Sequence, residues 1–351
     1  MSPQLPTSVR FTELCSRHSR ACKLKCLSKN TLLRHSQSQK LFLGFLGEDS
    51  IVESLSATHL EDFVLYLLDR HLKASTINVH LRTLKALWRW GTEIANPPLL
   101  EKNPFRRVSL LKEDEQLPGF FTPYEFLRLL HAADQEVNPL LCARNKAILL
   151  VLYDTGIRAE ELCDLHLMDY QDNTNTSVWK PNLATHDPKW IPAGTLTIQG
   201  KGGKERQVPI SPSTVQHLNN WRALLNEAVE NLKIQKKGEK TIALPTRLFC
   251  SSLLGQMTRG RLRVICAKLG ERVNLHCHPH KLRHSFAMFY LNSSPKEKES
   301  LQKILGHSSS RMTDHYARLL NRTNTRSHAS NSPVAKLMGD ARSREEALAI
   351  L

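Results

Sequence analysis

The stretch 276–316 constrains this chain more than any other part of the sequence. It contains an H-x-x-R pair formed by His280 and Arg283, an L-G-H triplet that ends at His307, and a tyrosine nine residues later, Tyr316. Each piece alone is common on solvated surfaces, in turns or along helices. Their order within one stretch predicts that they share a site.

Two further elements lie upstream, also in a defined order. Arg158 belongs to the T-G-x-R motif of DTGIRAEEL, and Lys201 lies between glycines in QGKGGKERQVPI. Alternating apolar residues in LTIQG and RQVPI predict two strands joined by a glycine-rich turn that carries Lys201. The five elements together resemble the signature of the tyrosine recombinases, the family of phage integrases and Xer-type recombinases. The resemblance covers residues 38–320 and is most specific from 145 to 320.

The resemblance implies two domains. One is an all-α N-terminal core-binding (SAM-like) domain, and the other is a mainly α-helical (α+β) catalytic domain with a small antiparallel sheet. Composition shifts and the Pro118-Gly119 pair indicate the boundaries. We expect a basic N-terminal extension (1–35), a helical core-binding domain that contacts DNA (36–112), a linker (113–121), a catalytic domain (122–325) and a C-terminal tail (326–351).

The residue types in the motifs fit an attack on a phosphodiester. A tyrosine hydroxyl can hold the bond energy in a covalent intermediate, although its ordinary pKa of about 10 requires a base or cations nearby. Arg158 and Arg283 suit the phosphate because a guanidinium binds two oxygens at once. Lys201 is suited to protonate the leaving 5′-oxygen. His280 and His307 are suited to donate to the phosphate or to exchange a proton with the tyrosine.

Further roles come from the resemblance. It implies that Tyr316 forms a 3′-phosphotyrosyl link and that Glu161 is an acidic residue supporting Arg158, for which a surface salt bridge is the alternative. His284 is interpreted as structural. No acidic cluster of the kind that holds Mg²⁺ accompanies the motif, so we expect a metal-independent, type IB topoisomerase-like reaction with no cofactor.

The net charge of +16 and the pI of about 9.6 predict a polyanionic partner. Nucleic acid is the first candidate and an anionic membrane surface the second. Since no long apolar run and no signal-peptide core are present, a cytoplasmic protein of a prokaryotic cell, working on the nucleoid, is expected. Around the predicted helix STINVHLRTLKALWRWGT (75–92) we expect Lys73, Arg82, Lys85 and Arg89 to contact phosphates, with a merely solubilising face as the alternative.

The eight cysteines are expected to be reduced thiols. Near the N-terminus, Cys15, His18, Cys22 and Cys26 match no C-x2-C spacing and would share one face of a helix. No metal site is therefore predicted there.

The leading hypothesis is a site-specific DNA recombinase. The resemblance implies a homo-tetramer that acts on two DNA duplexes carrying specific recombination sites, with no membrane partner and with accessory DNA-binding proteins as further candidate partners. The basic N-terminus and a long insert (171–190) favour integration or excision of a mobile element. Xer-like resolution of replicon dimers is the alternative, followed by a catalytically silent DNA-binding protein of the same fold. The tail ends in REEALAIL, which predicts a short helix that docks on a neighbouring subunit.

Overall fold

The computed structural model describes residues 8–113, 119–174, 193–200, 203–235, 245–251, 255–293, 297–307, 309–310 and 312–318. The predictions for Lys201, for most of the insert and for the tail fall outside these ranges. The chain divides into two compact units, Met1–Gln116 and Leu117–Leu351. Within the described ranges no helix is both long and apolar enough to cross a membrane.

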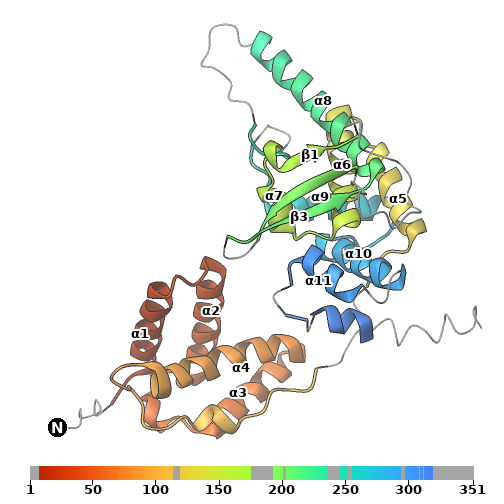
Figure 1. The fold of residues 1–351 in the computed structure, drawn as a ribbon. Coiled ribbons are helices and arrows are strands. Elements are labelled where there is room, and N and C mark those ends of the chain that lie inside the picture. The colour runs from red at the N-terminus through yellow and green to blue at the C-terminus, as the bar shows by residue number, and fades with distance from the viewer. Residues whose placement is uncertain are drawn as a thin grey trace, which may run out of the picture. The chain divides into compact units, whose positions relative to one another are not determined.

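Within residues 8–113 the regular elements of the first unit are all helices, as predicted (Figure 1). At its centre the ring of Phe42 contacts five other aromatic rings at centroid distances of 5.0–6.2 Å, and these belong to Phe11, Phe45, Phe63, Trp88 and Phe105. Such rings bury large apolar areas, so this cluster holds the unit together. The elements are α1 (Phe11–Leu24), α2 (Lys29–Leu46), η1 (Val52–Ser54), α3 (Ala57–Asp69), α4 (Ala74–Arg89), η2 (Trp90–Ile94) and η3 (Pro104–Arg107).

Helix α1 belongs to this core, so residues 8–35 do not form a separate extension. Phe11 and Leu14 are fully buried, and the Phe11 N–H donates to the carbonyl of Ser50. The expected boundary after residue 35 falls inside α2. The buried stripe of α1 continues through His18 and Cys22, which are weakly apolar and therefore make the helical period hard to recognise in the sequence.

The second unit is organised around α6 (Pro139–Thr155). This helix packs against α5, α8, α10 and strand β3, and most of its residues are buried. The other elements are α5 (Pro123–Asp134), α7 (Ala159–Asp164), η4 (Leu167–Asp169), β1 (Tyr170–Asp172), β2 (Gly194–Gln199), β3 (Glu205–Ile210), α8 (Pro212–Gln235), α9 (Arg259–Arg272), α10 (Pro279–Ser293) and α11 (Lys298–Leu305). Residues 312–318 are also helical.

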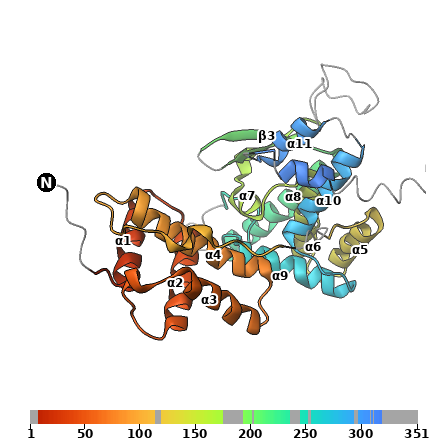
Figure 2. The same ribbon diagram turned by 90° about the horizontal axis from the view of Figure 1, so that it is seen from below.

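The small antiparallel sheet is confirmed, with strand order β1-β2-β3. The predicted strands correspond to β2 and β3, which pair with Leu196 opposite Val208 and Ile198 opposite Arg206. Strand β1 has only three residues and was not predicted. Helix α11 packs against β3 (Figure 2), which brings the chain near residue 306 beside the sheet.

Candidate active site

Two motif glycines end the helices on which the site is built. Gly156 ends α6 and Gly306 ends α11, both with positive φ (+62° and +63°), a conformation that side chains disfavour. A Cβ atom at Gly156 would lie 2.5 Å from the Phe286 ring, and one at Gly306 would lie 2.9 Å from the Arg206 guanidinium. Glycine is therefore required at both positions by backbone conformation and by space.

Arg283 is held from α10 by three hydrogen bonds. Its Nη1 donates to the carbonyl of Gly156 at 2.6 Å, and its Nη2 donates to the carbonyl of Leu305 at 3.0 Å and contacts His307 Nε2 at 2.8 Å. Burial, followed by the nearby charge of Arg158, lowers the pKa of Arg283 to about 10. The guanidinium therefore stays charged at neutral pH and is fixed before any substrate arrives.

Arg158 lies at the N-cap of α7 and remains more accessible. It donates to the carbonyls of Leu305 at 3.3 Å and Gly306 at 3.1 Å, and 40% of its side chain is exposed. Both motif arginines thus bind the Leu305 carbonyl, at the C-terminal end of α11. Two cations meet at one helix end, where the helix dipole favours positive charge.

Glu161 fixes Arg158, as the resemblance implies, but it also binds a second arginine. Its carboxylate accepts from the Arg158 N–H at 2.7 Å and from Arg158 Nη1 at 2.9 Å. Arg206 donates to both carboxylate oxygens, at 3.1 and 2.8 Å. Burial alone raises the pKa of Glu161, but the hydrogen bonds and charges of Arg206 and Arg158 outweigh it and hold the pKa below its ordinary value. Glu161 is therefore an ionised link between two arginines.

Arg206 was missed in the sequence. Its Nε donates to the carbonyl of Ile304 at 2.8 Å, so it ties β3 to α11 as well as to Glu161. The available signal was strand alternation, which places Arg206 on the same face of β3 as the buried Val208 and Ile210. A cation on an apolar face needs an anionic partner.

His307 is oriented by its two ring nitrogens. Nε2 faces the Arg283 guanidinium, which can only donate, so Nε2 accepts and the proton of the neutral ring lies on Nδ1. Nδ1 then donates to the Thr313 hydroxyl at 3.0 Å. Burial and the charges of Arg283 and Arg158 lower the pKa of His307 to about 4, which keeps the ring neutral at pH 7.

Tyr316 is buried against His284. The Tyr316 hydroxyl lies 2.7 Å from His284 Nδ1, and only 1% of the residue is exposed. Burial raises the pKa of the phenol, although the charges of Arg283 and Arg158 act in the opposite direction. Burial lowers the pKa of His284 to about 4, helped by the charges of neighbouring histidines and Arg283. His284, interpreted as structural from the sequence, thus has a neutral ring in hydrogen-bond contact with the phenol hydroxyl.

The other predicted site residues are placed less tightly. His280 is exposed on the first turn of α10, and partial burial and the charges of Arg283 and Arg158 lower its pKa. It lies within electrostatic reach of both arginines, but no hydrogen bond to a described residue fixes its ring. Lys201 lies outside the described residues.

Three of the four basic residues expected to contact DNA have partners within the first unit. Arg82 pairs with Glu113 at 3.0 Å and Arg89 with Glu93 at 3.0 Å. Lys85 donates to the carbonyls of Arg106 and Val108. Lys73 is exposed at the N-cap of α4. Exposed ion pairs are weak and can yield to a phosphate, whereas Lys85 has a structural task in holding η3.

Removing the charge of Glu161 is expected to slow DNA cleavage by about 10²-fold at saturating protein, because Arg158 loses its orientation. Glu161→Gln is the test and Glu160→Gln the matched control, since Glu160 is exposed and only approaches Arg259 at 3.7 Å. The measurement is the rate of covalent product formation together with DNA affinity. Equal rates for the two variants would show that Glu161 does not position Arg158.

Stability should rise with pH between about 4 and the ordinary histidine pKa of about 6.5. His284 and His307 have lowered pKa values in the folded state, so the unfolded chain binds more protons in this window. Their contribution is complete above pH 6.5 and is lost as pH falls toward 4. Thermal unfolding of wild type and His284→Gln at pH 8 and pH 5 measures it. The variant should lose more stability at pH 8 than at pH 5, and equal losses at both would refute the assignment.

Comparison with family models gives two matches. The model described as "Phage integrase family" matches residues 119–322, and the model described as "Phage integrase, N-terminal SAM-like domain" matches residues 14–95. The second match begins inside α1, in agreement with the place of this helix in the first unit.

Curated relatives include bacterial proteins named "Tyrosine recombinase XerC". The protein of Oceanobacillus iheyensis is 29% identical over 296 residues, which cover 83% of this chain and 86% of the relative. That of Escherichia coli O127:H6 is 28% identical over 297 residues, with coverage of 84% and 87%.

Solved structures with a similar fold are recombinases on DNA. XerH bound to a palindromic difH substrate, a post-cleavage complex, has a TM-score of 0.63 at 17% identity and covers 90% of this chain and 84% of XerH. The Tn1549 transposon integrase with transposon right-end DNA has a TM-score of 0.62 at 20% identity, with coverage of 88% and 94%. At these identities the likeness supports the fold.

Proposed function

This chain belongs to the phage integrase family of tyrosine recombinases, and from that premise we propose that it cleaves and rejoins DNA at specific sites through a 3′-phosphotyrosyl intermediate. The observation that carries the proposal is the Tyr316 hydroxyl, 2.7 Å from a neutral His284 and near Arg283 and His307. A buried phenol beside a proton acceptor and a pair of arginines fits a nucleophile aimed at a phosphate.

In the proposed step the phenolic oxygen of Tyr316 attacks the phosphorus and forms a P–O bond. Its proton passes to His284, and the bond from phosphorus to the 5′-oxygen breaks. The departing oxygen takes a proton from Lys201, the role that the motif assigns. The Arg158 and Arg283 guanidiniums neutralise the charge that develops on the phosphate oxygens, with His280 as a further donor and His307 holding Arg283 through the contact at its Nε2. Rejoining is the same sequence in reverse with a new 5′-hydroxyl.

We propose that this chemistry needs no metal ion. The groups that would stabilise charge on the phosphate are arginines and imidazoles, and the carboxylate of Glu161 is already bound by Arg158 and Arg206. A divalent ion bound between phosphate and protein prefers free carboxylates. DNA binding must also make Tyr316 accessible, because the hydroxyl is buried in this conformation.

The proposed partner is double-stranded DNA with two recombination sites, acted on by a homo-tetramer in the cytoplasm of a prokaryotic cell. The hypothesis that the protein integrates or excises a mobile element depends on two sequence features, the basic N-terminus and the insert. In the structure, residues 8–35 of this N-terminus form α1 and the start of α2 within the helical first unit. The first feature therefore no longer favours a mobile element. The curated relatives named XerC favour the second candidate, resolution of replicon dimers.

Covalent capture tests the chemistry. DNA carrying a nick next to the cleaved bond releases a short fragment after attack and traps the protein on the remaining strand. A denaturing gel should show a protein–DNA band with wild-type protein and unchanged yield in excess chelator. Absence of the band on genomic fragments as well as synthetic sites would favour the silent DNA-binding alternative. Sequencing the trapped DNA distinguishes the two biological roles. A mobile-element recombinase should be trapped at the ends of an element, whereas a resolvase of replicon dimers should be trapped at a single chromosomal site.

A further inference from the structure

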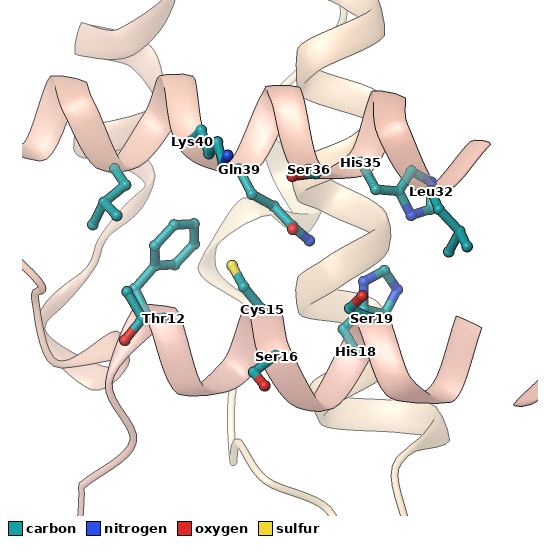
Figure 3. A pocket seen from close by; sticks show the side chains of 12 residues that line it. Thr12, Cys15, Ser16, His18, Ser19, Leu32, His35, Ser36, Gln39 and Lys40 are labelled. Atoms are coloured by element: carbon teal, nitrogen blue, oxygen red, sulfur yellow. The ribbon is translucent and has the colours of Figure 1, made fainter. Parts of the chain in front are cut away.

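A cluster of two histidines and one cysteine lies between α1 and α2, in the first unit. His18 and Cys22 are one turn apart on α1, and His35 approaches from α2. Cys22 Sγ lies 3.4 Å from His18 Nε2 and 4.0 Å from His35 Nδ1. The potential ligand atoms all lie within 4.8 Å of one another. Figure 3 shows the His18 and His35 rings close together from the two helices, and the ring centroids are 5.4 Å apart.

A short turn brings these residues into register. Helix α1 ends at Leu24 and α2 begins at Lys29, with Ser28 capping α2 by accepting from the Thr31 N–H. The two helices then pack side by side. A ligand contributed by the second helix cannot be recognised from spacing along the first, which is why the sequence analysis considered only Cys15, His18, Cys22 and Cys26, predicted no metal site and did not include His35.

A cavity of about 330 Å³ lies beside the cluster and is lined by His18, His35 and Gln39 among others (Figure 3). His18 and Gln39 are more than nine-tenths buried, at 5% and 8% exposure. His18 Nδ1 and Gln39 Nε2 have no hydrogen-bond partner among the described residues. Buried polar atoms normally have partners, so these two atoms are available to a polar ligand or a water molecule in the cavity.

We propose that His18, Cys22 and His35 bind a zinc ion that joins α1 to α2. Tetrahedral zinc with bonds of about 2.0–2.3 Å places its nitrogen and sulfur ligands about 3.5 Å apart, close to the two separations observed. Imidazole and thiolate ligands favour zinc over Mg²⁺ or Ca²⁺. A water molecule completes the four-coordinate shell. Cys22 binds as the thiolate and releases its proton to solvent, and both histidines bind as neutral rings.

The proposed ion stabilises the first unit and takes no part in strand cleavage. Ligands from two helices make metal binding favourable for the folded form only, so the bound ion adds to the stability of this unit. Removing it should lower thermal stability and weaken DNA binding through the first unit. The rate of covalent product formation at saturating DNA should stay the same, which separates this proposal from the proposed reaction.

The test uses the full-length protein, reduced and stripped with a chelator, and titrated with Co²⁺. One equivalent should produce a thiolate-to-cobalt charge-transfer band and the visible absorption of tetrahedral cobalt, and Zn²⁺ should remove both. Cys22→Ser should eliminate the band and weaken zinc binding by more than about a hundredfold. Cys26→Ser is the matched control, because Cys26 is exposed at the end of α1 and outside the cluster.

Each outcome decides the proposal. A band that is lost in Cys22→Ser and in His35→Gln but kept in Cys26→Ser supports it. No band with wild-type protein, or a band that persists in Cys22→Ser, overturns it and leaves the cluster as ordinary packing between two helices. Circular dichroism of each variant shows whether a lost band reflects lost ligands, and native mass spectrometry of the zinc-loaded wild type must show one ion per chain.

Discussion

Tyr316→Phe should give no covalent protein–DNA product while DNA affinity stays nearly unchanged. The substitution removes only the hydroxyl that would attack the phosphate, and no second phenol lies in the described part of the site to replace it. Affinity depends mainly on many contacts between cationic side chains and phosphates, and the chain carries a net charge of +16. Product is measured with nicked DNA on a denaturing gel, and affinity with intact DNA at one fixed salt concentration.

Tyr290→Phe is the matched control for this experiment. Tyr290 lies on the same helix as Arg283, and its hydroxyl donates to Glu297 at 2.8 Å. This variant should form the covalent product at the wild-type rate. A covalent band from the Tyr316→Phe variant would mean that another side chain is the nucleophile.

The sequence predicted those parts of the fold that depend on local chemistry. Thr122 and Glu125 form a reciprocal cap of α5, with the Thr122 N–H donating to Glu125 at 2.7 Å, and the T-x-x-E spacing of such a cap is visible in the sequence. The alternating segments became β2 and β3. The ordered motif also named Arg158, Arg283, His307 and Tyr316. For Arg158 and His307 the local signal is a glycine of positive φ, Gly156 two residues before Arg158 and Gly306 directly before His307.

The misses share one physical cause, which is contact between segments distant in sequence. Arg206 reaches Glu161 across β3 and α7, and His284 reaches Tyr316 across 32 positions of the chain. His35 meets His18 only after α2 folds against α1. The hydrophobic periodicity of a single helix or strand does not predict such contacts. The predicted domain boundary after residue 35 was wrong for a related reason. The buried face of α1 is recognisable in the sequence only when His18 and Cys22 are counted as core residues.

Lys201→Ala should slow cleavage of ordinary DNA by about 10²–10⁴-fold, the usual loss for a general acid. The residue lies outside the described part of the chain, so this prediction rests on the motif between β2 and β3. Among the described residues of the site, Arg158 and Arg283 do not release protons readily. Burial and neighbouring arginines lower the pKa values of His280 and His307, which makes both side chains poor general acids at pH 7. A lysine is therefore the best donor to the leaving 5′-oxygen.

A substrate with sulfur in place of the bridging 5′-oxygen separates proton donation from binding. A thiolate leaves without protonation, so the Lys201→Ala variant should cleave this DNA at nearly the wild-type rate. Lys204→Ala is the matched control, because Lys204 is exposed on the same hairpin and its backbone carbonyl accepts from the Gly200 N–H at 2.7 Å, a bond that the substitution keeps. It should cleave both substrates normally. Equal impairment of the Lys201→Ala variant on both substrates would assign the proton to another group. His280 is the next candidate, because its ring is exposed and no hydrogen bond to a described residue fixes it.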